Sequence, residues 1–270
     1  MGVRARNRRC AGLTGVKIAV LAACHNRREK TLACLRGLRR SVENTDCAAV
    51  TVFLVDDGSV DGTADSVATA FPEVRVIIGD GSLYWAKGMR KAWEVAVAER
   101  SDWDGYLWLN DDIELDEDAV GKTIAEIGKY PNDVIVAMLR DRSSGCSVYG
   151  MGDNGLFTGS FVYVPKEVYG KVGMLSDAYR HAWADYDYAM MCRRAGVMCR
   201  CMDYTVGMIE AHPLRPSLKG LSLPERLLML KDPKGWCLAD LWTYRVRNFG
   251  IFRAVGSCLH LAFHVLTARK

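Results

Sequence analysis

The strongest constraint on the fold is a regular alternation of short apolar runs with amphipathic segments over the first half of the chain. We expect strands at 16–23, 50–55, 74–78, 106–109 and 134–138, and helices at 28–42, 61–70, 85–100 and 116–128. Strands that alternate with helices at this spacing indicate a mostly parallel sheet with helices on both faces. The sequence therefore predicts an α/β fold with a Rossmann-like sheet.

Polar clusters follow the first four predicted strands. They are His25-Asn26-Arg27, Asp56-Asp57-Gly58-Ser59, the segment 79–85, and Asn110-Asp111-Asp112. In parallel α/β sheets, ligands bind beyond the carboxyl ends of the strands. We therefore expect these clusters to line one crevice.

Each of the two acidic clusters has two interpretations. Asp56 and Asp57 can accept hydrogen bonds from a nucleoside base or ribose, or they can cap the turn before the next helix. Asp111 and Asp112 are hard oxygen ligands of the kind that Mg²⁺ and Mn²⁺ take, with phosphate and water completing the shell. The alternative for this second pair is an acidic surface turn. The combination is more specific than either cluster alone, because both must face one crevice.

The segment 79–88 carries several glycines, two aromatic residues and Lys87. Its glycines permit a close approach of the backbone to a ligand, and the helix that follows can direct its N-terminus at a diphosphate. We expect Trp85 either to contact a sugar or to lie in the core. Lys87 is expected either to reach a phosphate or to be solvated.

After residue 140 the pattern changes. We expect a loop at 143–159, a strand at 161–164, and a helix at 186–195 that ends at Gly196. Beyond 213 the chain is basic and aromatic, with two helical pieces punctuated by proline. This organisation predicts a basic tail at 1–15, an α/β domain at 16–212 and a C-terminal helical extension at 213–270. The domain divides into a first half at about 16–115 and a second half at about 116–212.

Four motifs resemble those of family 2 glycosyltransferases and follow the family's order. Residues 17–27 and 54–63 resemble the family's opening, and 108–115 resembles its metal-binding Asp-x-Asp stretch. Residues 159–165 and 184–188 resemble its acceptor-side and catalytic-base motifs. The resemblance covers about 17–212. It implies the glycosyltransferase A fold, a nucleotide-diphosphate-sugar donor, Mn²⁺ or Mg²⁺, and inversion at the anomeric carbon. It also implies a nucleotide-sugar half at about 16–115 and an acceptor half at about 116–212.

The resemblance also implies roles for individual residues. Asp57 would face the base or ribose, Asp112 would bind the metal on the donor diphosphate, and Asp185 would be the general base. His212 lies where some relatives place a metal-binding histidine, and the alternative is a turn residue before a proline. The other candidates are Asn26, Arg27, Trp85, Lys87 and Asp111 on the donor side, and Ser160 and Asp187 on the acceptor side.

Two details qualify these roles. The family commonly has an aspartate at the position of Asn110, which leaves Asp112, with Asp111, as the strong metal ligands. Asp185 has an alternative role as the N-cap of its helix. Because Asp185 and Asp187 are two positions apart, they point to nearly opposite sides of a helix, and only one can comfortably face the acceptor.

We therefore expect an enzyme that moves a sugar to a hydroxyl of a glycan or glycolipid, in bacterial cell-surface polysaccharide synthesis. One alternative is a nucleotide-sugar or carbohydrate-binding protein without catalysis, for which Asn110 is the warning sign. Another is a sugar-phosphate nucleotidyltransferase, but residues 22–27 lack the glycines of its phosphate loop. A dinucleotide oxidoreductase is disfavoured because no Gly-x-Gly-x-x-Gly follows a strand.

Composition narrows the partners and the compartment. The net charge of +4 argues against nucleic-acid binding. Several of the ten cysteines lie inside predicted strands or helices, where free cysteine packs as a small hydrophobe, which favours a reduced, cytosolic compartment. No long apolar region precedes Lys17, and no uncharged apolar stretch reaches the roughly 18 residues that span a bilayer.

The C-terminal segment 238–270 combines aromatic side chains with basic ones. They are Trp242, Tyr244, Phe249, Phe252 and Phe263, and Arg245, Arg247, Arg253, Arg269 and Lys270. This composition is typical of a peripheral helix on acidic lipid headgroups, which would place the acceptor at the inner face of the plasma membrane. The alternatives are a helical pair packed on the sheet and a homodimer contact, with the same residues as core.

Overall fold

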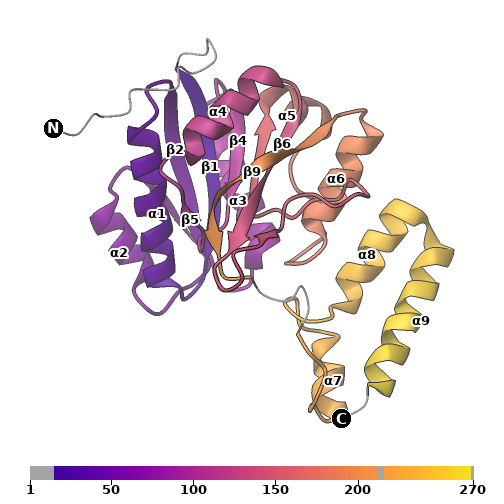
Figure 1. Cartoon of the computed structure of the whole chain (residues 1–270). Coiled ribbons are helices and arrows are strands. Elements are labelled where there is room, and N and C mark those ends of the chain that lie inside the picture. The colour runs from indigo at the N-terminus through magenta and orange to yellow at the C-terminus, as the bar shows by residue number, and fades with distance from the viewer. Residues whose placement is uncertain (1–14, 212–215, 269–270) are drawn as a thin grey trace.

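The computed structural model describes residues 15–211 and 216–268 (Figure 1). The strands are β1 Val16–Cys24, β2 Ala48–Asp56, β3 Arg75–Ile78, β4 Gly105–Leu109, β5 Glu114–Leu115, β6 Val134–Asp141, β7 Ser147–Val148, β8 Phe161–Pro165 and β9 Cys199–Ile209. The helices are α1 Arg28–Glu43, α2 Thr63–Ala70, α3 Tyr84–Glu99, α4 Ala119–Lys129, α5 Lys166–Val172, α6 Ala184–Arg194, α7 Leu223–Met229, α8 Leu238–Phe249 and α9 Ile251–Thr267. Residues 1–14 of the predicted basic tail lie outside the described residues.

These strands form one sheet in the order β3-β2-β1-β4-β8-β6-β9-β5, with β7 paired to β6. The pairs β1–β2, β2–β3, β1–β4 and β6–β9 are parallel. β8 is antiparallel to both β4 and β6, so β6 still runs in the direction of β4. The mostly parallel sheet predicted from the sequence is confirmed, and β8 is the strand that reverses direction near its centre.

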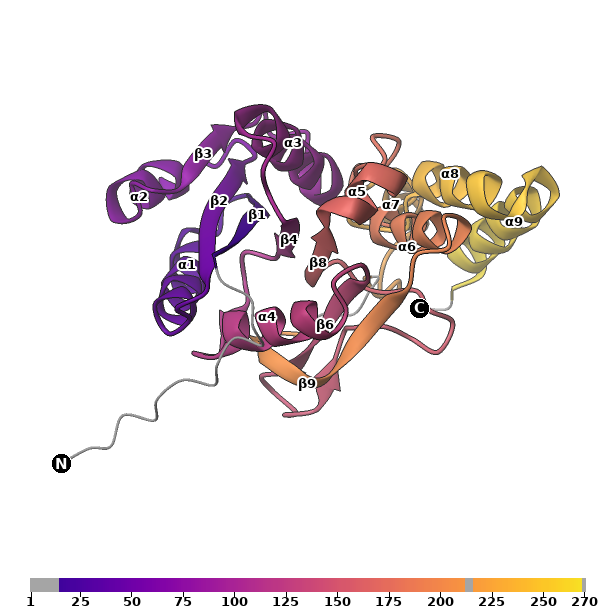
Figure 2. The same cartoon turned by 90° about the horizontal axis from the view of Figure 1, so that it is seen from above.

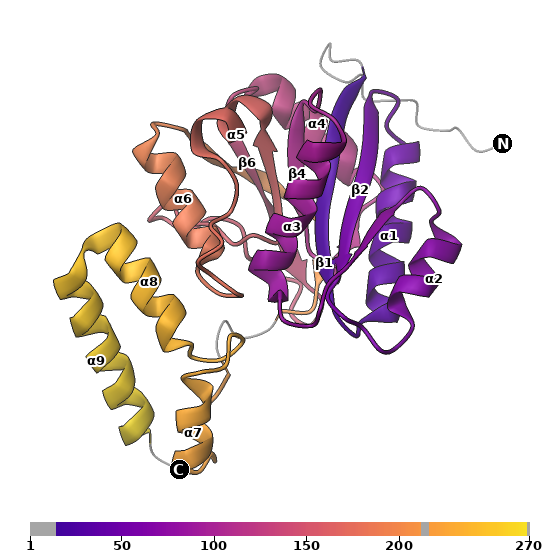
Figure 3. The same ribbon diagram turned by 180° about the vertical axis from the view of Figure 1, so that it is seen from behind.

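Helices cover both faces of the sheet, which explains why its central strands are apolar throughout (Figures 2 and 3). Along β1, Ile18 and Val20 pack in the layer of α1, α2 and α4, whereas Ala19 and Leu21 pack in the layer of α3, α5 and α6. α3 lies close to the sheet, since a Cβ at Gly88 would come within 2.9 Å of the Ala23 Cβ. This close packing fixes the N-terminus of α3 beside the ends of β1 and β2.

The helices α7, α8 and α9 form a group to one side of the sheet, beside α6 (Figure 1). They enclose a small apolar core of Leu218, Leu241, Leu261 and Val265. The sequence predicted two helical pieces here, and the described residues contain three helices. Gly250, which interrupts the apolar period of the segment 238–270, has a φ of 85° in the left-handed region and separates α8 from α9.

Four further elements were not predicted, namely β5, β7, β9 and α5. β5 and β7 have two residues each, too few to show a period. β9 contains polar residues such as Arg200 and Asp203, and its pairing with β6 has two register shifts, so its alternation is broken. The region after residue 140 therefore contains more of the sheet than its pattern indicated.

The four cysteines predicted to lie inside strands or helices are free: Cys24, Cys34 and Cys192 are buried, and Cys258 is half-buried. Cys47, which is also buried, is disulfide-bonded, so the prediction of reduced cysteines does not hold for this one. Within residues 15–211 and 216–268, no helix is both long enough and apolar enough to cross a membrane.

Candidate active site

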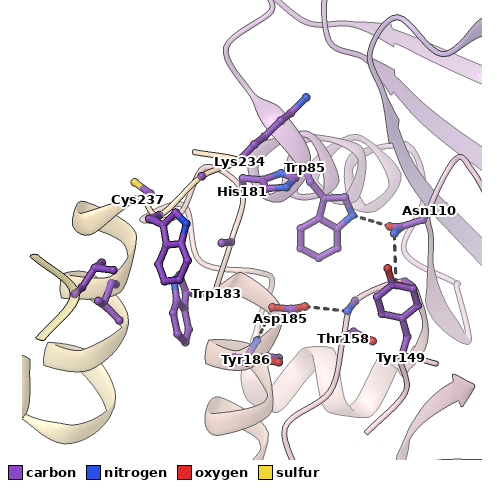
Figure 4. Close-up of a pocket in the computed structure, with 17 residues that line it drawn as sticks. Trp85, Asn110, Tyr149, Thr158, His181, Trp183, Asp185, Tyr186, Lys234 and Cys237 are labelled. Carbon is purple, nitrogen blue, oxygen red and sulfur yellow. Dashed lines mark hydrogen bonds between the residues drawn. The ribbon is translucent and has the colours of Figure 1, made fainter. Parts of the chain in front are cut away.

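Two cavities join at the carboxyl ends of β1, β2 and β4. The acidic cavity, of about 490 Å³, is lined by side chains that include Arg27, Asp57, Asp111 and Asp112. The Asp185 cavity, of about 340 Å³, lies next to it (Figure 4). Six residues line both cavities: Trp85, Asn110, Tyr149, Ser160, His181 and Lys234. Members of all four predicted polar clusters line the acidic cavity, so the predicted crevice exists.

Asp57 is buried at the end of β2, where its carboxylate accepts three backbone hydrogen bonds. Oδ1 accepts from the N–H groups of Gly81 at 2.9 Å and Leu83 at 3.2 Å, and Oδ2 accepts from that of Tyr84 at 2.8 Å. These donors lie at the start of α3, where a helix cannot pair its own N–H groups. Asp57 therefore caps α3, and the amides of Leu83 and Tyr84 are already bonded. Its contact with a base or ribose stays a prediction.

His25 and Asn26 connect the loop after β1 to the loop after β2. His25 Nδ1 lies 2.7 Å from the carbonyl oxygen of Asp57, so this nitrogen donates, and Nε2 accepts from the Asn26 amide at 3.0 Å. Asn26 Oδ1 accepts from the N–H of Val60 at 2.8 Å. Asn26, a predicted donor-binding residue, lines neither cavity and holds the two loops together.

Arg27 bridges the two acids that follow β4. Its Nη1 lies 3.2 Å from Asp111 Oδ1 and 2.8 Å from Asp112 Oδ2, and Asp111 also accepts from the Thr31 hydroxyl at 3.1 Å. Burial raises the pKa of Asp111 to about 6, although the Arg27 charge acts to lower it. Asp112 Oδ1 is buried and has no hydrogen-bond partner among the described residues. The cluster therefore offers a desolvated carboxylate oxygen to a ligand.

Asn110, which departs from the family pattern, bonds two neighbours at once. Its Oδ1 accepts from the indole N–H of Trp85 at 2.9 Å, and its Nδ2 donates to Ser160 Oγ at 3.5 Å. Because an indole N–H can only donate, the amide oxygen must face Trp85. An ionised aspartate could accept from Trp85 but could not donate to Ser160. The asparagine thus positions two side chains that line both cavities.

Asp185 lies in the first turn of α6, half-buried, and lines its cavity (Figure 4). Its Oδ2 accepts from the N–H of Gly159 at 3.0 Å and its Oδ1 from that of Tyr186 at 2.9 Å. Burial raises the pKa of Asp185 to about 6, although both N–H groups lower it. The N-cap of α6 is Trp183, with a φ of 74°, so the alternative that Asp185 is the N-cap is wrong.

Gly159 joins Asp185 to Trp85. A Cβ at this position would lie 2.4 Å from the Trp85 ring and 3.3 Å from the Asp185 Cβ. The indole therefore rests directly on the backbone that donates to Asp185. Of the two interpretations of Trp85, the structure shows a half-buried ring that is packed on one side and lines the crevice on the other.

Asp187 points away from the crevice, as its separation from Asp185 predicted. It is fully buried; Oδ2 pairs with Arg247 at 3.2 Å and Oδ1 accepts from Asn248 at 2.7 Å. Both partners lie on α8, so Asp187 fastens the C-terminal helices to α6. It was predicted on the acceptor side, and it lines neither cavity of the crevice.

The crevice also contains residues that the sequence did not single out. His181 lines both cavities; burial and the nearby Lys234 charge lower its pKa to about 4, so it is neutral at neutral pH. Lys234 lies 6.0 Å from the centre of the Tyr84 ring. No local motif marks either position. Lys87 lines neither cavity of the crevice, and His212 lies outside the described residues.

The sheet order, with β8 reversed between β4 and β6, and the acidic crevice at the strand ends define an α/β protein of the glycosyltransferase A fold. The sequence matches Glycosyl transferase family 2 over residues 19–195, and the chain belongs to this family. Its role is therefore glycosyl transfer, and the resemblance carried by the four motifs is confirmed. Among curated proteins, no sequence matches.

Solved structures agree on the fold. The mannosyltransferase PcManGT of Pyrobaculum calidifontis, in complex with GDP-Man and Mn²⁺, is 13% identical; the match covers 96% of this chain and 72% of that one, with a TM-score of 0.57. Residues 1–349 of S. aureus TarS, in complex with UDP-GlcNAc, are 12% identical over 92% of this chain and 73% of that one, with a TM-score of 0.56. A longer TarS structure is matched over 44% of its length.

Proposed function

We propose that this chain is an inverting glycosyltransferase that moves a sugar from a nucleotide-diphosphate donor to a hydroxyl of a glycan or glycolipid. The observation that carries the proposal is the joined crevice. The Asp185 carboxylate, whose pKa is raised to about 6, lies at one end, and Asp111 and Asp112, bridged by Arg27, lie at the other. Trp85, Asn110 and Ser160 line both cavities and are bonded to one another. A sugar held between the two ends would contact these three residues.

Asp185 is the proposed general base. Its pKa of about 6 keeps it ionised at neutral pH while leaving it basic enough to accept a proton. The carboxylate takes the proton of the acceptor hydroxyl as the oxygen bonds to the anomeric carbon. The bond from that carbon to the diphosphate oxygen breaks, and the nucleoside diphosphate leaves. Attack opposite the leaving group inverts the configuration.

The cluster after β4 fits a divalent cation, because Asp112 Oδ1 is buried and has no hydrogen-bond partner in the described part of the chain. The described residues contain no group of three or more potential metal ligands, so the protein would supply one or two carboxylates and the donor phosphates the rest. We assign Asp112, with Asp111, to Mn²⁺ or Mg²⁺. Such a cation neutralises charge on the leaving diphosphate. Arg27, which now bridges both carboxylates, must give way to it, and a ligand role for His212 stays a prediction.

The proposed acceptor lies at a membrane, as in bacterial cell-surface polysaccharide synthesis at the inner face of the plasma membrane. α9 exposes Phe252, Val255, Leu259, Phe263 and Leu266, which are three or four residues apart and share one face. Residues 241–268 contain three arginines and no acidic residue. An apolar face with this charge is complementary to anionic lipid, and we propose that it rests on the bilayer surface.

A donor screen tests the proposal. We expect one nucleoside diphosphate, or its sugar, to raise the melting temperature in the presence of Mn²⁺, because a ligand of the folded state stabilises it. The same donor should be turned over with Mn²⁺. Asp112→Asn should weaken Mn²⁺-dependent binding by calorimetry about tenfold or more, and Glu117→Gln, at an exposed carboxylate nearby, should not.

Two results would contradict parts of this assignment. Undiminished Mn²⁺-dependent binding by Asp112→Asn would remove the metal from this cluster. Donor binding without any turnover, with a range of glycan acceptors, would favour the binding protein without catalysis.

A further inference from the structure

A third cavity, of about 460 Å³, lies between α8, α9 and the segment that precedes α8. It shares four walls with the Asp185 cavity: Trp183, Trp236, Leu241 and Leu261. Its other side chains with polar atoms are Arg245, Ser257, His260 and His264, and no carboxylate lines it. The cavity therefore adjoins the acceptor end of the crevice and presents positive charge and hydrogen-bond donors.

Arg245 is the residue of this cavity whose surroundings most favour binding of an anion. Its Nε is buried and has no hydrogen-bond partner among the described residues. Its guanidinium lies 5.3 Å from the centre of the Phe249 ring and 6.0 Å from that of Tyr244. Within residues 216–268, no carboxylate forms an ion pair with it. Arg245 is half-buried and its guanidinium stays charged at every ordinary pH, so a bound anion would pair the buried Nε, which has lost its contact with water.

The α9 side of the cavity adds donors at helical spacing. Ser257, His260 and His264 are three and four residues apart, so they share one face of α9. His264 also packs against Trp236, with ring centres 5.2 Å apart. Hydroxyl and imidazole groups can each donate to an anion, and Arg245 reaches the same space from α8. Two helices thus direct donors into a space with aromatic and leucine walls.

We propose that this third cavity binds a phosphate or diphosphate group. The planar guanidinium fork matches the oxygens of a phosphate, and the serine and histidines supply further donors. The four shared walls place the third cavity beside the Asp185 cavity, at the acceptor end of the crevice. The phosphate therefore belongs to the acceptor, which is a phosphorylated or lipid-diphosphate-linked glycan. That last step rests on the proposed function. The anion site itself does not depend on it.

Calorimetry on the full chain, in EDTA, tests the site with three probes: inorganic pyrophosphate, farnesyl diphosphate and farnesol. Arg245→Gln should weaken binding of both diphosphates about tenfold. Arg253→Gln, at an exposed arginine of α9 that does not line the cavity, is the matched control and should bind as the wild type does. Binding of a probe at the donor site would be the same in the wild type, Arg245→Gln and Arg253→Gln, so it does not affect this comparison.

The probes also identify the source of the anion. Farnesyl diphosphate that binds more tightly than pyrophosphate indicates a lipid-linked group, and equal affinities indicate a free or sugar-borne phosphate. Wild-type affinity in Arg245→Gln, or farnesol that binds as tightly as farnesyl diphosphate, overturns the site. If Arg245→Gln fails to fold by circular dichroism, His260→Gln, at an exposed position, replaces it with the same expected direction. None of these measurements needs turnover, so failure of the proposed transfer reaction is seen separately.

Discussion

At the scale of single residues, the carboxylates in and around the crevice differ in how completely neighbouring residues bond them. Asp57 is bonded to three amides and Asp187 to two side chains of α8, so both stabilise local structure. Among the described residues, Asp112 keeps a buried oxygen without a hydrogen-bond partner, and Asp185 keeps a raised pKa. Because such groups cost stability, we propose that these two carboxylates act on ligands.

Replacing Asp185 by asparagine removes the proton acceptor and keeps the size. We expect kcat to fall on the order of 10²-fold or more, with donor binding unchanged. In the wild type, kcat should fall as the pH drops through about 6, because Asp185 then becomes protonated. Steady-state kinetics from pH 5 to 8 check this, with Asp177→Asn, at an exposed carboxylate, as the control. Normal turnover by Asp185→Asn would place the base elsewhere.

The raised pKa of Asp185 also predicts how the stability of Asp185→Asn, relative to the wild type, changes with pH. The folded-state pKa of Asp185 lies above its unfolded value, so its favourable contribution is complete below pH 3.8 and is lost as the pH rises through about 6. Asparagine has one acceptor oxygen for the two N–H groups, which costs stability at every pH. The pH effect adds to that cost, so the melting temperature of Asp185→Asn relative to the wild type should be higher at pH 8 than at pH 5. A difference that becomes less favourable from pH 5 to pH 8 would contradict the raised pKa.

Asp57→Ala tests whether the cap also binds the donor. Three amide donors lose their acceptor, so we expect a loss of about 1–3 kcal/mol in the free energy of unfolding, as for other buried donors left unpaired. If Asp57 contacts base or ribose, nucleotide affinity measured without metal should also fall. Lower stability with unchanged affinity would leave Asp57 only as the residue that shapes its loop.

At the scale of elements, the site depends on how closely α3, β8 and α6 approach one another. α3 is placed by Gly88 against β1, and its N-terminus is capped from β2 by Asp57. The N–H of Ala86, in the first turn of α3, bonds the carbonyl of Arg180 in the loop before α6. Residues far apart in the sequence thereby fix the distance between Trp85 and Asp185.

Gly159→Ala should disturb this junction. The new methyl group would meet the Trp85 ring, so the indole must move and its bond to Asn110 must weaken. We expect a loss of about 1–3 kcal/mol in the free energy of unfolding, as for other overpacked sites, with a drop in kcat/KM. Gly170→Ala is the control, because its Cβ would meet nothing within 4 Å and α5 would gain a better helix former. Equal melting temperatures and rates for the two variants would contradict the junction.

At the scale of the whole molecule, the C-terminal helices and the segment before them complete one wall of the Asp185 cavity. Trp236, Cys237 and Leu241 line the Asp185 cavity, and Arg247 and Asn248 hold α8 to Asp187. Of the aromatic and basic residues predicted to face a membrane, Tyr244 is buried and Arg247 is paired, whereas Trp242, Phe252 and Phe263 are exposed. Arg269 and Lys270 lie outside the described residues. One helical group thus carries both a packed inner side and an apolar outer side.

Vesicle binding tests whether the exposed apolar face of α9 rests on a membrane. The full chain should co-sediment with phosphatidylcholine vesicles that contain phosphatidylglycerol, more weakly at high salt and with pure phosphatidylcholine. The double variant Phe252→Ser/Phe263→Ser should lose this binding, and Val60→Ser, which removes an exposed apolar residue elsewhere, should not. Sedimentation that shows a dimer lost in the double variant, with no vesicle binding, would assign the face to a second copy of the chain.

The sequence alone determined the alternation of strands and helices and the positions of the polar clusters. Both follow from local period and from the rule that parallel strands end at one edge, so β1 to β4 and the residues around Asp57, Asp112 and Asp185 could be predicted. The family resemblance followed from the same local motifs. The hydrophobic period of the sequence could not reveal short or irregular strands such as β9.

Only the tertiary structure decided what each side chain does. Asp57 caps α3 because amides at the start of that helix reach it, and Asp187 fastens α8 to α6 because side chains of α8 reach it. His181 and Lys234 joined the crevice although no motif marks them. The physical reason is that hydrogen bonds, burial and charge act between residues near in space, and those neighbours are often far apart in the chain. Local period carries no information about contacts across such distances.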